Sequence, residues 1–104
     1  MIKKIKTLLG MGPGVDYKQL VKDGAIILDV RSHNEFNGGH IKGSVNIPVD
    51  QIHENIHKLK DKNRVIITCC ASGMRSASAK SILESKGFTK VYNGGGWFSL
   101  QNRL

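Results

Sequence analysis

The residues of this chain best suited to chemistry are a cysteine and an arginine separated by four residues, in the segment Cys70-Ala71-Ser72-Gly73-Met74-Arg75-Ser76. An apolar run precedes the cysteine and an Ala/Ser-rich segment follows the arginine, so we expect a loop between a buried strand and a helix. Backbone N–H groups at a helix N-terminus lack intrahelical partners, and a loop bent around them forms an anion-binding nest. Gly73 gives the backbone freedom for that bend, and Arg75 adds a permanent positive charge.

A cysteine at the mouth of such a nest has a lowered pKa, because the nest stabilises its thiolate. Cys70 is therefore predicted to be a nucleophile that acts on an anion. The alternative is a buried, inert cysteine at a strand end, and the glycine and arginine that follow favour the nucleophile.

The neighbouring cysteine, Cys69, is predicted to be a core residue, because successive residues of a strand face opposite sides of a sheet. A lesser alternative is that Cys69 resolves an oxidised Cys70. Two adjacent cysteines form only a strained disulfide, so the chain has no structural disulfide framework. We therefore expect a reducing compartment, the cytoplasm.

Three further residues are candidates for a supporting role. Asp29 and Arg31 end a buried strand, and Ser76 follows the loop. In one interpretation, Asp29 and Arg31 form hydrogen bonds that position the Cys70 loop. In the other, they belong to a strand-end ion pair, with Arg31 bound to Glu35, and affect the loop only indirectly.

Histidines and aromatic residues give weaker signals. His40 precedes a short strand and is expected to stabilise the fold. His53 and His57 lie four residues apart and could supply half of a metal site, but no third ligand is evident, so we expect no metal and no cofactor. Trp97 and Phe98 are expected to fill an edge of the core.

Strands and helices alternate along the whole chain. Strands are expected at residues 25–30, 44–47, 64–69 and 90–93, and helices at 16–24, 33–36, 50–59 and 75–86. The spacings of Asp16 with Gln19 and of Ser32 with Glu35 predict capping boxes at the first two helices, and Asp50 is expected to cap the third. This order predicts an α/β domain with a mostly parallel central sheet flanked by helices. Ligands bind beyond the carboxyl ends of the strands in such sheets, which is where the Cys70 loop is expected.

Length and charge limit the possible partners. The 104 residues allow one domain, expected at residues 15–104 after a basic tail of residues 1–14. Sixteen Lys and Arg against eight Asp and Glu give a formal charge of +8, which favours small anions or general solvation. No nucleic-acid motif is found, and no apolar segment is long enough to span a membrane, so we expect neither partner.

At these residues the chain resembles the rhodanese-like sulfurtransferases. The Cys70 loop is similar to the active-site loop of that family, although many members have a basic or polar residue where this chain has Ala71. Three further segments match family patterns in order and spacing: Leu28-Asp29-Val30-Arg31 with Glu35-Phe36; Gly39-His40-Ile41-Lys42-Gly43-Ser44-Val45-Asn46-Ile47-Pro48; and Gly87-Phe88 with Val91-Tyr92 and Gly94-Gly95-Gly96-Trp97. Together they cover roughly residues 15–98.

The resemblance implies a mechanism. Cys70 would attack the outer sulfur of a small anionic donor such as thiosulfate, become a persulfide held by the amides of residues 71–75, and pass the sulfur to a thiol, cyanide or a protein. Related phosphatases have one more residue between cysteine and arginine, so the loop length favours sulfur over phosphate. Two alternatives remain: a persulfide carrier or interaction module without turnover, and a small phosphatase or arsenate reductase.

Overall fold

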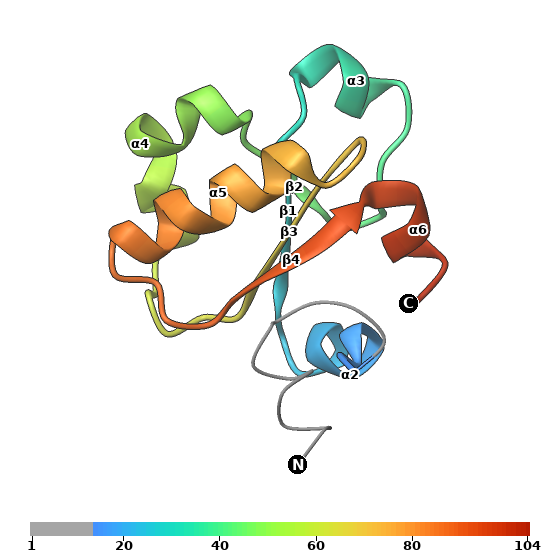
Figure 1. The fold of residues 1–104 in the computed structure, drawn as a ribbon, viewed down its shortest axis with the longest axis horizontal. Helices are drawn as coiled ribbons and strands as arrows, with labels where there is room; N and C mark the ends of the chain where they lie inside the picture. Colours follow the sequence, from blue (N-terminus) through green and yellow to red (C-terminus); the bar gives the residue numbers. More distant parts are fainter. Residues whose placement is uncertain (1–13) are drawn as a thin grey trace.

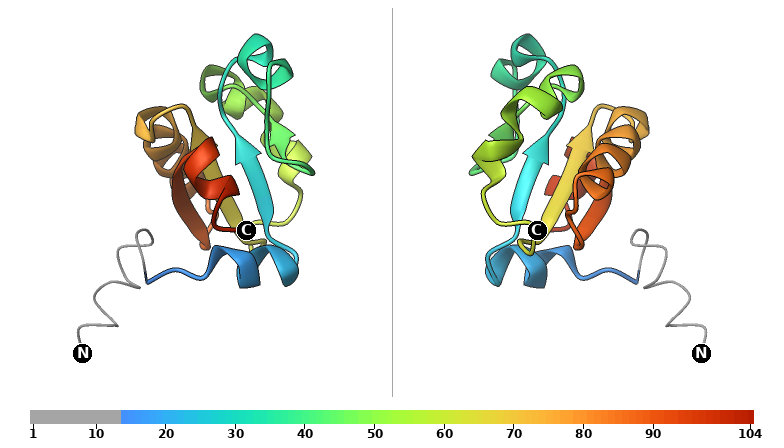
Figure 2. Two further views of the ribbon diagram at one scale, coloured as in Figure 1. Left: turned by 90° about the vertical axis from the view of Figure 1, so that its right-hand side faces the viewer. Right: turned by 90° about the vertical axis from the view of Figure 1, so that its left-hand side faces the viewer.

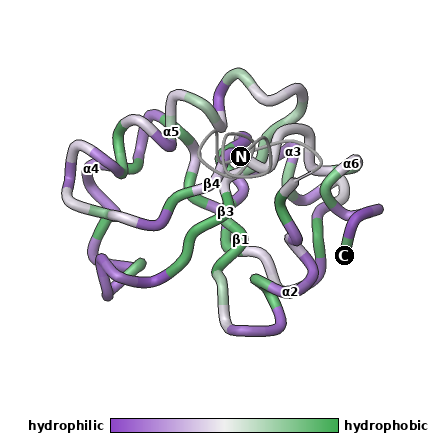
Figure 3. The backbone as a smooth tube through the Cα atoms, turned by 60° about the horizontal axis from the view of Figure 1, so that its bottom comes forward, coloured by the Kyte–Doolittle hydropathy of each residue, from purple (hydrophilic) through white to green (hydrophobic). Residues whose placement is uncertain are grey.

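The chain folds around a parallel sheet. The computed structural model describes residues 14–104, and its strands are β1 (Ile26–Asp29), β2 (Val45–Asn46), β3 (Ile66–Cys70) and β4 (Val91–Gly96). Within these residues all three strand pairs are parallel, in the order β2-β1-β3-β4. The central strands β1 and β3 come from the two strongest apolar runs. In Figure 3 both strands are coloured mainly as hydrophobic where they pass through the centre of the molecule. The prediction of an α/β domain with a parallel sheet is confirmed.

Helices cover both faces of this sheet. The helices of the described residues are α2 (Tyr17–Lys22), α3 (His33–Asn37), η1 (Val49–Gln51), α4 (Ile52–Asn55), η2 (Ile56–Leu59), α5 (Met74–Ser85) and α6 (Trp97–Gln101). In Figure 1, α4 and α5 lie on one side of the strands and α6 on the other. The two views of Figure 2 place α2 at the end of the sheet opposite α3.

The sheet separates two buried clusters, and β3 contributes to both. Ile66 and Cys70 belong to the cluster under α4 and α5, which includes Leu83. Ile67 and Cys69 belong to the cluster under α2 and α6. Since alternate residues of a strand face opposite sides, the adjacent cysteines enter different cores, and the prediction that Cys69 is a core residue is confirmed.

Capping residues explain where several helices begin. Ser32 and Glu35 form the predicted capping box at α3, each side chain bonding the other's backbone N–H. Asp16 accepts the backbone N–H of Gln19, but the Gln19 side chain donates to another residue, so only half of the predicted box forms. Asp50 was expected to cap the next helix; η1 instead begins after Pro48, which offers no side-chain cap.

Three segment predictions need correction. The helix expected at residues 50–59 is divided into η1, α4 and η2. Strand β3 extends to Cys70, one residue beyond the expected end. Strand β4 was expected to stop at Asn93 but continues to Gly96. Glycine usually weakens strands, yet a Cβ on Gly94 would lie 2.9 Å from Ile67, Leu100 and the Thr68 carbonyl oxygen, so close approach of the backbone requires it.

Two expectations concern the limits of the domain and the membrane. The predicted basic tail of residues 1–14 lies outside the described residues except for its last position, and the domain boundary stays a prediction. Among residues 14–104, no helix combines the length and apolar character needed to cross a bilayer.

Candidate active site

Cys70 lies at the carboxyl end of β3, where a short turn leads into α5. It is the last residue of the strand rather than the first of the loop, and it is fully buried. Gly73 is the N-cap of α5 with a φ of 102°, a left-handed conformation that residues with a Cβ rarely adopt. This glycine turns the chain so sharply that the first amides of α5 face back toward the end of β3.

The Cys70 sulfur accepts hydrogen bonds from this turn. The Gly73 amide lies 3.0 Å and the Ser76 amide 3.3 Å from Sγ, and the Ser76 hydroxyl oxygen lies 3.5 Å away. Burial acts to raise the pKa of Cys70, but hydrogen bonds from the Ser76 hydroxyl and from the amides of Ser76, Gly73 and Ser72 together lower it below its ordinary value. The geometry therefore suits a thiolate nucleophile.

Cys69 has the opposite electrostatics. Its thiol is buried in the other core, and burial, with the negative charge of Asp29 as a further cause, raises its pKa to about 12. A thiol in that state is not a nucleophile at neutral pH.

Asn93 of β4 completes the polar surroundings of the sulfur. Its side-chain oxygen accepts a hydrogen bond of 2.7 Å from the Ser76 hydroxyl and one of 2.9 Å from the Gly95 amide. Its side-chain nitrogen donates to the Gly73 carbonyl oxygen at 3.4 Å. Sequence reasoning missed Asn93, because it is distant in sequence from Cys70 and the strand pattern only marked it as a strand residue.

The glycines of β4 allow the Cys70 loop to pack closely against the sheet. A Cβ built on Gly96 would lie 3.0 Å from the Ala71 carbonyl oxygen, and one on Gly73 would lie 3.5 Å from Gly95 Cα. The glycine run matched the family pattern, but its contact with the loop becomes visible only in the fold.

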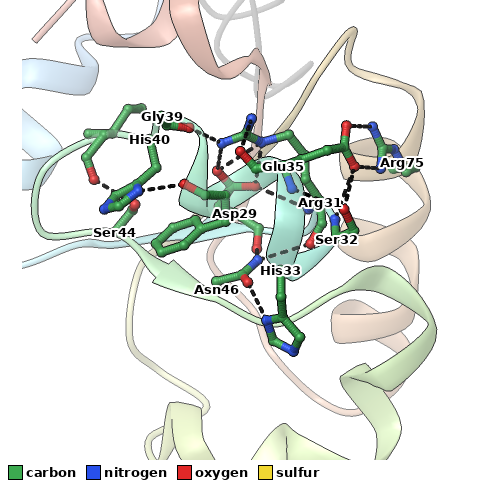
Figure 4. Close-up of polar contacts among 12 residues, drawn as sticks. Asp29, Arg31, Ser32, His33, Glu35, Gly39, His40, Ser44, Asn46 and Arg75 are labelled. Atoms are coloured by element: carbon green, nitrogen blue, oxygen red, sulfur yellow. Dashed lines mark hydrogen bonds and ion pairs between the residues drawn. The ribbon is translucent and has the colours of Figure 1, made fainter.

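Arg75 reaches from α5 toward α3. Its guanidinium donates to both carboxylate oxygens of Glu35, at 2.8 and 3.0 Å, and Figure 4 shows Glu35 between Arg75 and Ser32. The Arg75 hydrogen bond is the main cause that lowers the pKa of Glu35 to about 2. Arg75 thus joins the Cys70 loop to α3, whereas the sequence had indicated only that it adds a positive charge to the anion-binding loop.

Arg31 and Asp29 form a buried pair at the end of β1. Arg31 donates to the Asp29 carboxylate at 2.7 to 3.1 Å and also to the Gly39 carbonyl oxygen at 2.7 Å (Figure 4). Its guanidinium lies 4.7 Å from the centroid of the Trp97 ring. The suggested ion pair of Arg31 with Glu35 is therefore wrong: Arg31 reaches only the Glu35 carbonyl oxygen. Residues two apart in a strand face the same side, so alternation could have identified the Asp29 pair.

The remaining candidates lie apart from the sulfur. His40 donates from Nδ1 to the Phe36 carbonyl oxygen, and its ring stacks on the Phe36 ring with centroids 3.7 Å apart. Across residues 14–104, no group of three or more His, Cys, Asp and Glu is arranged to hold a metal ion, and His53 and His57 gain no third ligand there. Trp97 packs against the α2 and α6 core, but Phe98 is 65% exposed, so the expectation that both fill a core edge is wrong for Phe98.

Known proteins share both the sequence pattern and the fold. The profile of the rhodanese-like domain matches residues 15–103. Thiosulfate sulfurtransferase PspE of Escherichia coli is 37% identical over 70 residues, which cover 66% of this chain and 67% of PspE. Thiosulfate sulfurtransferase GlpE of Ectopseudomonas mendocina is 34% identical over 83 residues, which cover 80% of this chain and 75% of GlpE. The solved structure of a rhodanese with anions from E. coli has a TM-score of 0.68 at 34% identity, over 72% of this chain and 89% of that one. The chain therefore belongs to the rhodanese-like domain family.

Proposed function

We propose that this protein is a sulfurtransferase that carries sulfur on Cys70 as a persulfide. The proposal rests on the surroundings of the Cys70 sulfur. Sγ accepts hydrogen bonds from two backbone amides within 3.3 Å and lies beside the Ser76 hydroxyl. The thiosulfate sulfurtransferase relatives support a rhodanese-like enzyme.

The reaction has two displacement steps. In the first, the Cys70 thiolate attacks the outer sulfur of thiosulfate, and sulfite leaves with the electron pair of the broken S–S bond. In the second, an acceptor thiolate or cyanide attacks the terminal sulfur of the persulfide, and the electron pair of that S–S bond returns to Cys70 Sγ. The buried amides stabilise the anionic sulfur at the start and end of each cycle.

Anions suit this site better than neutral substrates. The terminal sulfur of the persulfide would be held by the turn of residues 71–75, which the Gly73 conformation wraps around the end of β3. Cys70 itself is buried, while Ala71 and Ser72 of the turn that follows it are exposed to solvent. The turn has four residues between Cys70 and Arg75, which favours one sulfur atom over a phosphate group. A free thiolate of this kind favours a reducing compartment such as the cytoplasm.

Mass spectrometry of the intact protein tests the proposal. Incubation with thiosulfate should add the mass of one sulfur atom, and added cyanide should remove it as thiocyanate. Cys70→Ser should abolish the adduct, whereas Cys69→Ser, the matched control one residue away, should keep it. The absence of an adduct from thiosulfate and from organic persulfides would exclude the sulfurtransferase.

The same assay separates the two alternatives. An adduct that forms on Cys70 but never passes to cyanide or small thiols identifies a carrier without turnover. Release of phosphate from an aryl phosphate ester, with no sulfur adduct, identifies a phosphatase.

A further inference from the structure

The Ser76 hydroxyl has more acceptors than hydrogen atoms. It carries one hydrogen, and two acceptors lie beside its oxygen: the Asn93 side-chain oxygen at 2.7 Å and the Gly73 carbonyl oxygen at 3.0 Å. Cys70 Sγ lies 3.5 Å from the same oxygen; as a thiol it donates to Ser76, and as a thiolate it becomes a third acceptor. Ser76 and Cys70 are fully buried, and Asn93 is only 9% exposed. The hydroxyl can donate its hydrogen to only one acceptor at a time. A stronger hydrogen bond to one acceptor therefore leaves a weaker one, or none, for the others.

Hydrogen bonds to other groups fix the position of Asn93. The Gly95 amide fixes its side-chain oxygen at 2.9 Å, and its side-chain nitrogen bonds the Gly73 carbonyl oxygen at 3.4 Å. Its backbone carbonyl oxygen accepts the Tyr17 hydroxyl at 3.2 Å from the other face of the sheet. The amide oxygen therefore stays near Ser76 whatever the state of the sulfur, whereas the hydroxyl is free to rotate.

We propose that Asn93 is a positioning residue, which holds the Ser76 hydroxyl hydrogen when the Cys70 sulfur is neutral and releases it when that sulfur carries charge. The inference rests on the proposed sulfur transfer. Asn93 is proposed to contact neither the sulfur donor nor the sulfur acceptor, and to act only through Ser76.

The proposed role follows the charge through one cycle. In the persulfide, Sγ is an uncharged disulfide-like sulfur, and the Ser76 hydroxyl donates to the Asn93 oxygen. When an acceptor attacks the terminal sulfur, the S–S electron pair moves to Sγ, which becomes a thiolate. The hydroxyl then rotates to Sγ and stabilises the leaving group, while the Gly95 amide still satisfies the Asn93 oxygen.

Other charges near the sulfur do not explain such an effect. From α5, Arg75 interacts electrostatically with Cys70, and Glu35 of α3 neutralises it. On β3 the neighbour is the un-ionised Cys69, and beside it the Asp29–Arg31 pair ends β1. Substituting Ser76 or Asn93 by alanine leaves all of these groups in place.

The test is a double-mutant cycle on the titration of Cys70, followed by the ultraviolet absorbance of the thiolate and by the pH profile of iodoacetamide alkylation. Ser76→Ala should raise the apparent pKa of Cys70, because the sulfur loses a donor. Asn93→Ala should lower it by about half a unit, because the hydroxyl loses its competing acceptor. Asn93→Ala in the Ser76→Ala background should cause no shift.

A near-isosteric variant covers the case in which Asn93→Ala does not fold. Asn93→Asp keeps the acceptor for Ser76 and the Gly95 amide but holds the hydrogen more strongly, so it should raise the apparent pKa of Cys70. Asn93→Asp should raise the apparent pKa of Cys70 more in the protein that keeps Ser76 than in the Ser76→Ala background. In that background only repulsion between the carboxylate that the substitution introduces and the thiolate remains. Equal shifts in both backgrounds, or none in either, would overturn the role of Asn93.

Sulfur transfer gives a second readout. Ser76→Ala should slow the discharge of the persulfide to cyanide several-fold, whereas Ser78→Ala, an exposed serine on the same helix, should not. The thiolate titration needs no sulfur donor, so a failure to form the persulfide would reject the proposed function without deciding the role of Asn93. Discharge rates unchanged in Ser76→Ala would reject the leaving-group role.

Discussion

The two adjacent cysteines have opposite fates because one peptide bond moves the side chain to the other face of the sheet. Cys70 meets the amides of a helix N-terminus, whereas Cys69 meets an apolar core. Hydrogen-bond donors stabilise a thiolate, and an apolar surrounding disfavours it. The difference in their pKa values, one lowered and one raised to about 12, is therefore a property of strand alternation.

This difference predicts selective alkylation. Iodoacetamide at pH 8 should label one thiol of the folded protein, and peptide mapping should place the label on Cys70. The reaction should already proceed below the ordinary thiol pKa of 9.0, because the thiolate of Cys70 is stabilised. Cys69 should react only after denaturation, and labelling of both thiols at equal rates in the folded protein would contradict the assignment.

Glu35 gives a second prediction at the residue scale, on stability and pH. Its pKa falls from 4.5 to about 2 on folding, chiefly through the Arg75 hydrogen bond. A carboxyl group whose pKa is lower in the folded protein stabilises the fold at pH values above its pKa in the unfolded chain. That stabilisation is lost as the pH falls through its pKa in the folded protein. At pH 6 the melting temperature of the wild-type protein should be higher than that of Glu35→Gln. The difference between the two melting temperatures should shrink as the pH falls from about 4.5 to about 2.

A matched variant controls for the general effect of removing a carboxylate. Glu84→Gln lies on the exposed part of α5 and breaks no ion pair among the described residues. Its melting temperature should follow that of wild type at every pH. A gap between wild type and Glu35→Gln that persisted at pH 2 would show that the Arg75 pair is not its cause.

At the scale of elements, β4 positions the site as much as β3 does. Asn93 and the three glycines after it bring the backbone of β4 against the Cys70 turn. Gly94 is the tightest point, since a Cβ there would meet two core side chains and a backbone oxygen at 2.9 Å. A backbone atom cannot rotate aside, so the strand can approach only with a glycine at this position.

Gly94→Ala should therefore destabilise the protein by about 1–3 kcal/mol, the usual cost of overpacking a core. Urea unfolding monitored by circular dichroism measures this change. Gly38→Ala is the matched control, because a Cβ there meets only ordinary contacts of 3.5 Å or more; its effect should stay within about 0.5 kcal/mol. Equal losses in both variants would contradict the packing argument.

At the scale of the whole molecule, the charge of +8 should influence how the substrate arrives. Glu35 and Asp29 are paired, so acidic groups near the carboxyl ends of β1 and β3 are already neutralised by arginines. A positive field increases the encounter rate of anions, and salt screens it over about 10 Å at 0.1 M.

Sulfur transfer from thiosulfate should therefore weaken with ionic strength. The value of kcat/KM for thiosulfate should fall several-fold between about 0.01 M and 0.5 M salt, because screening shortens the reach of the field. An uncharged organic trisulfide serves as the control donor, with little change expected. The same salt dependence for both donors would argue against electrostatic attraction.

The sequence by itself determined the features that depend on near neighbours. Apolar runs fixed β1 and β3 to within a few residues, the Ser32–Glu35 spacing marked the start of α3, and the segment after Cys70 marked the helix N-terminus that faces the sulfur. Helix and strand periodicity act over a few residues, so these features can be derived from short segments.

Only the tertiary structure decided which distant groups meet. It turned Arg75 toward Glu35, forty residues away, and placed Asn93 beside Ser76, seventeen residues away. It also extended β4 through glycines that local rules treat as a strand end. Each of these contacts depends on how parallel strands align at one edge of the sheet, and that alignment is set by packing across the whole core.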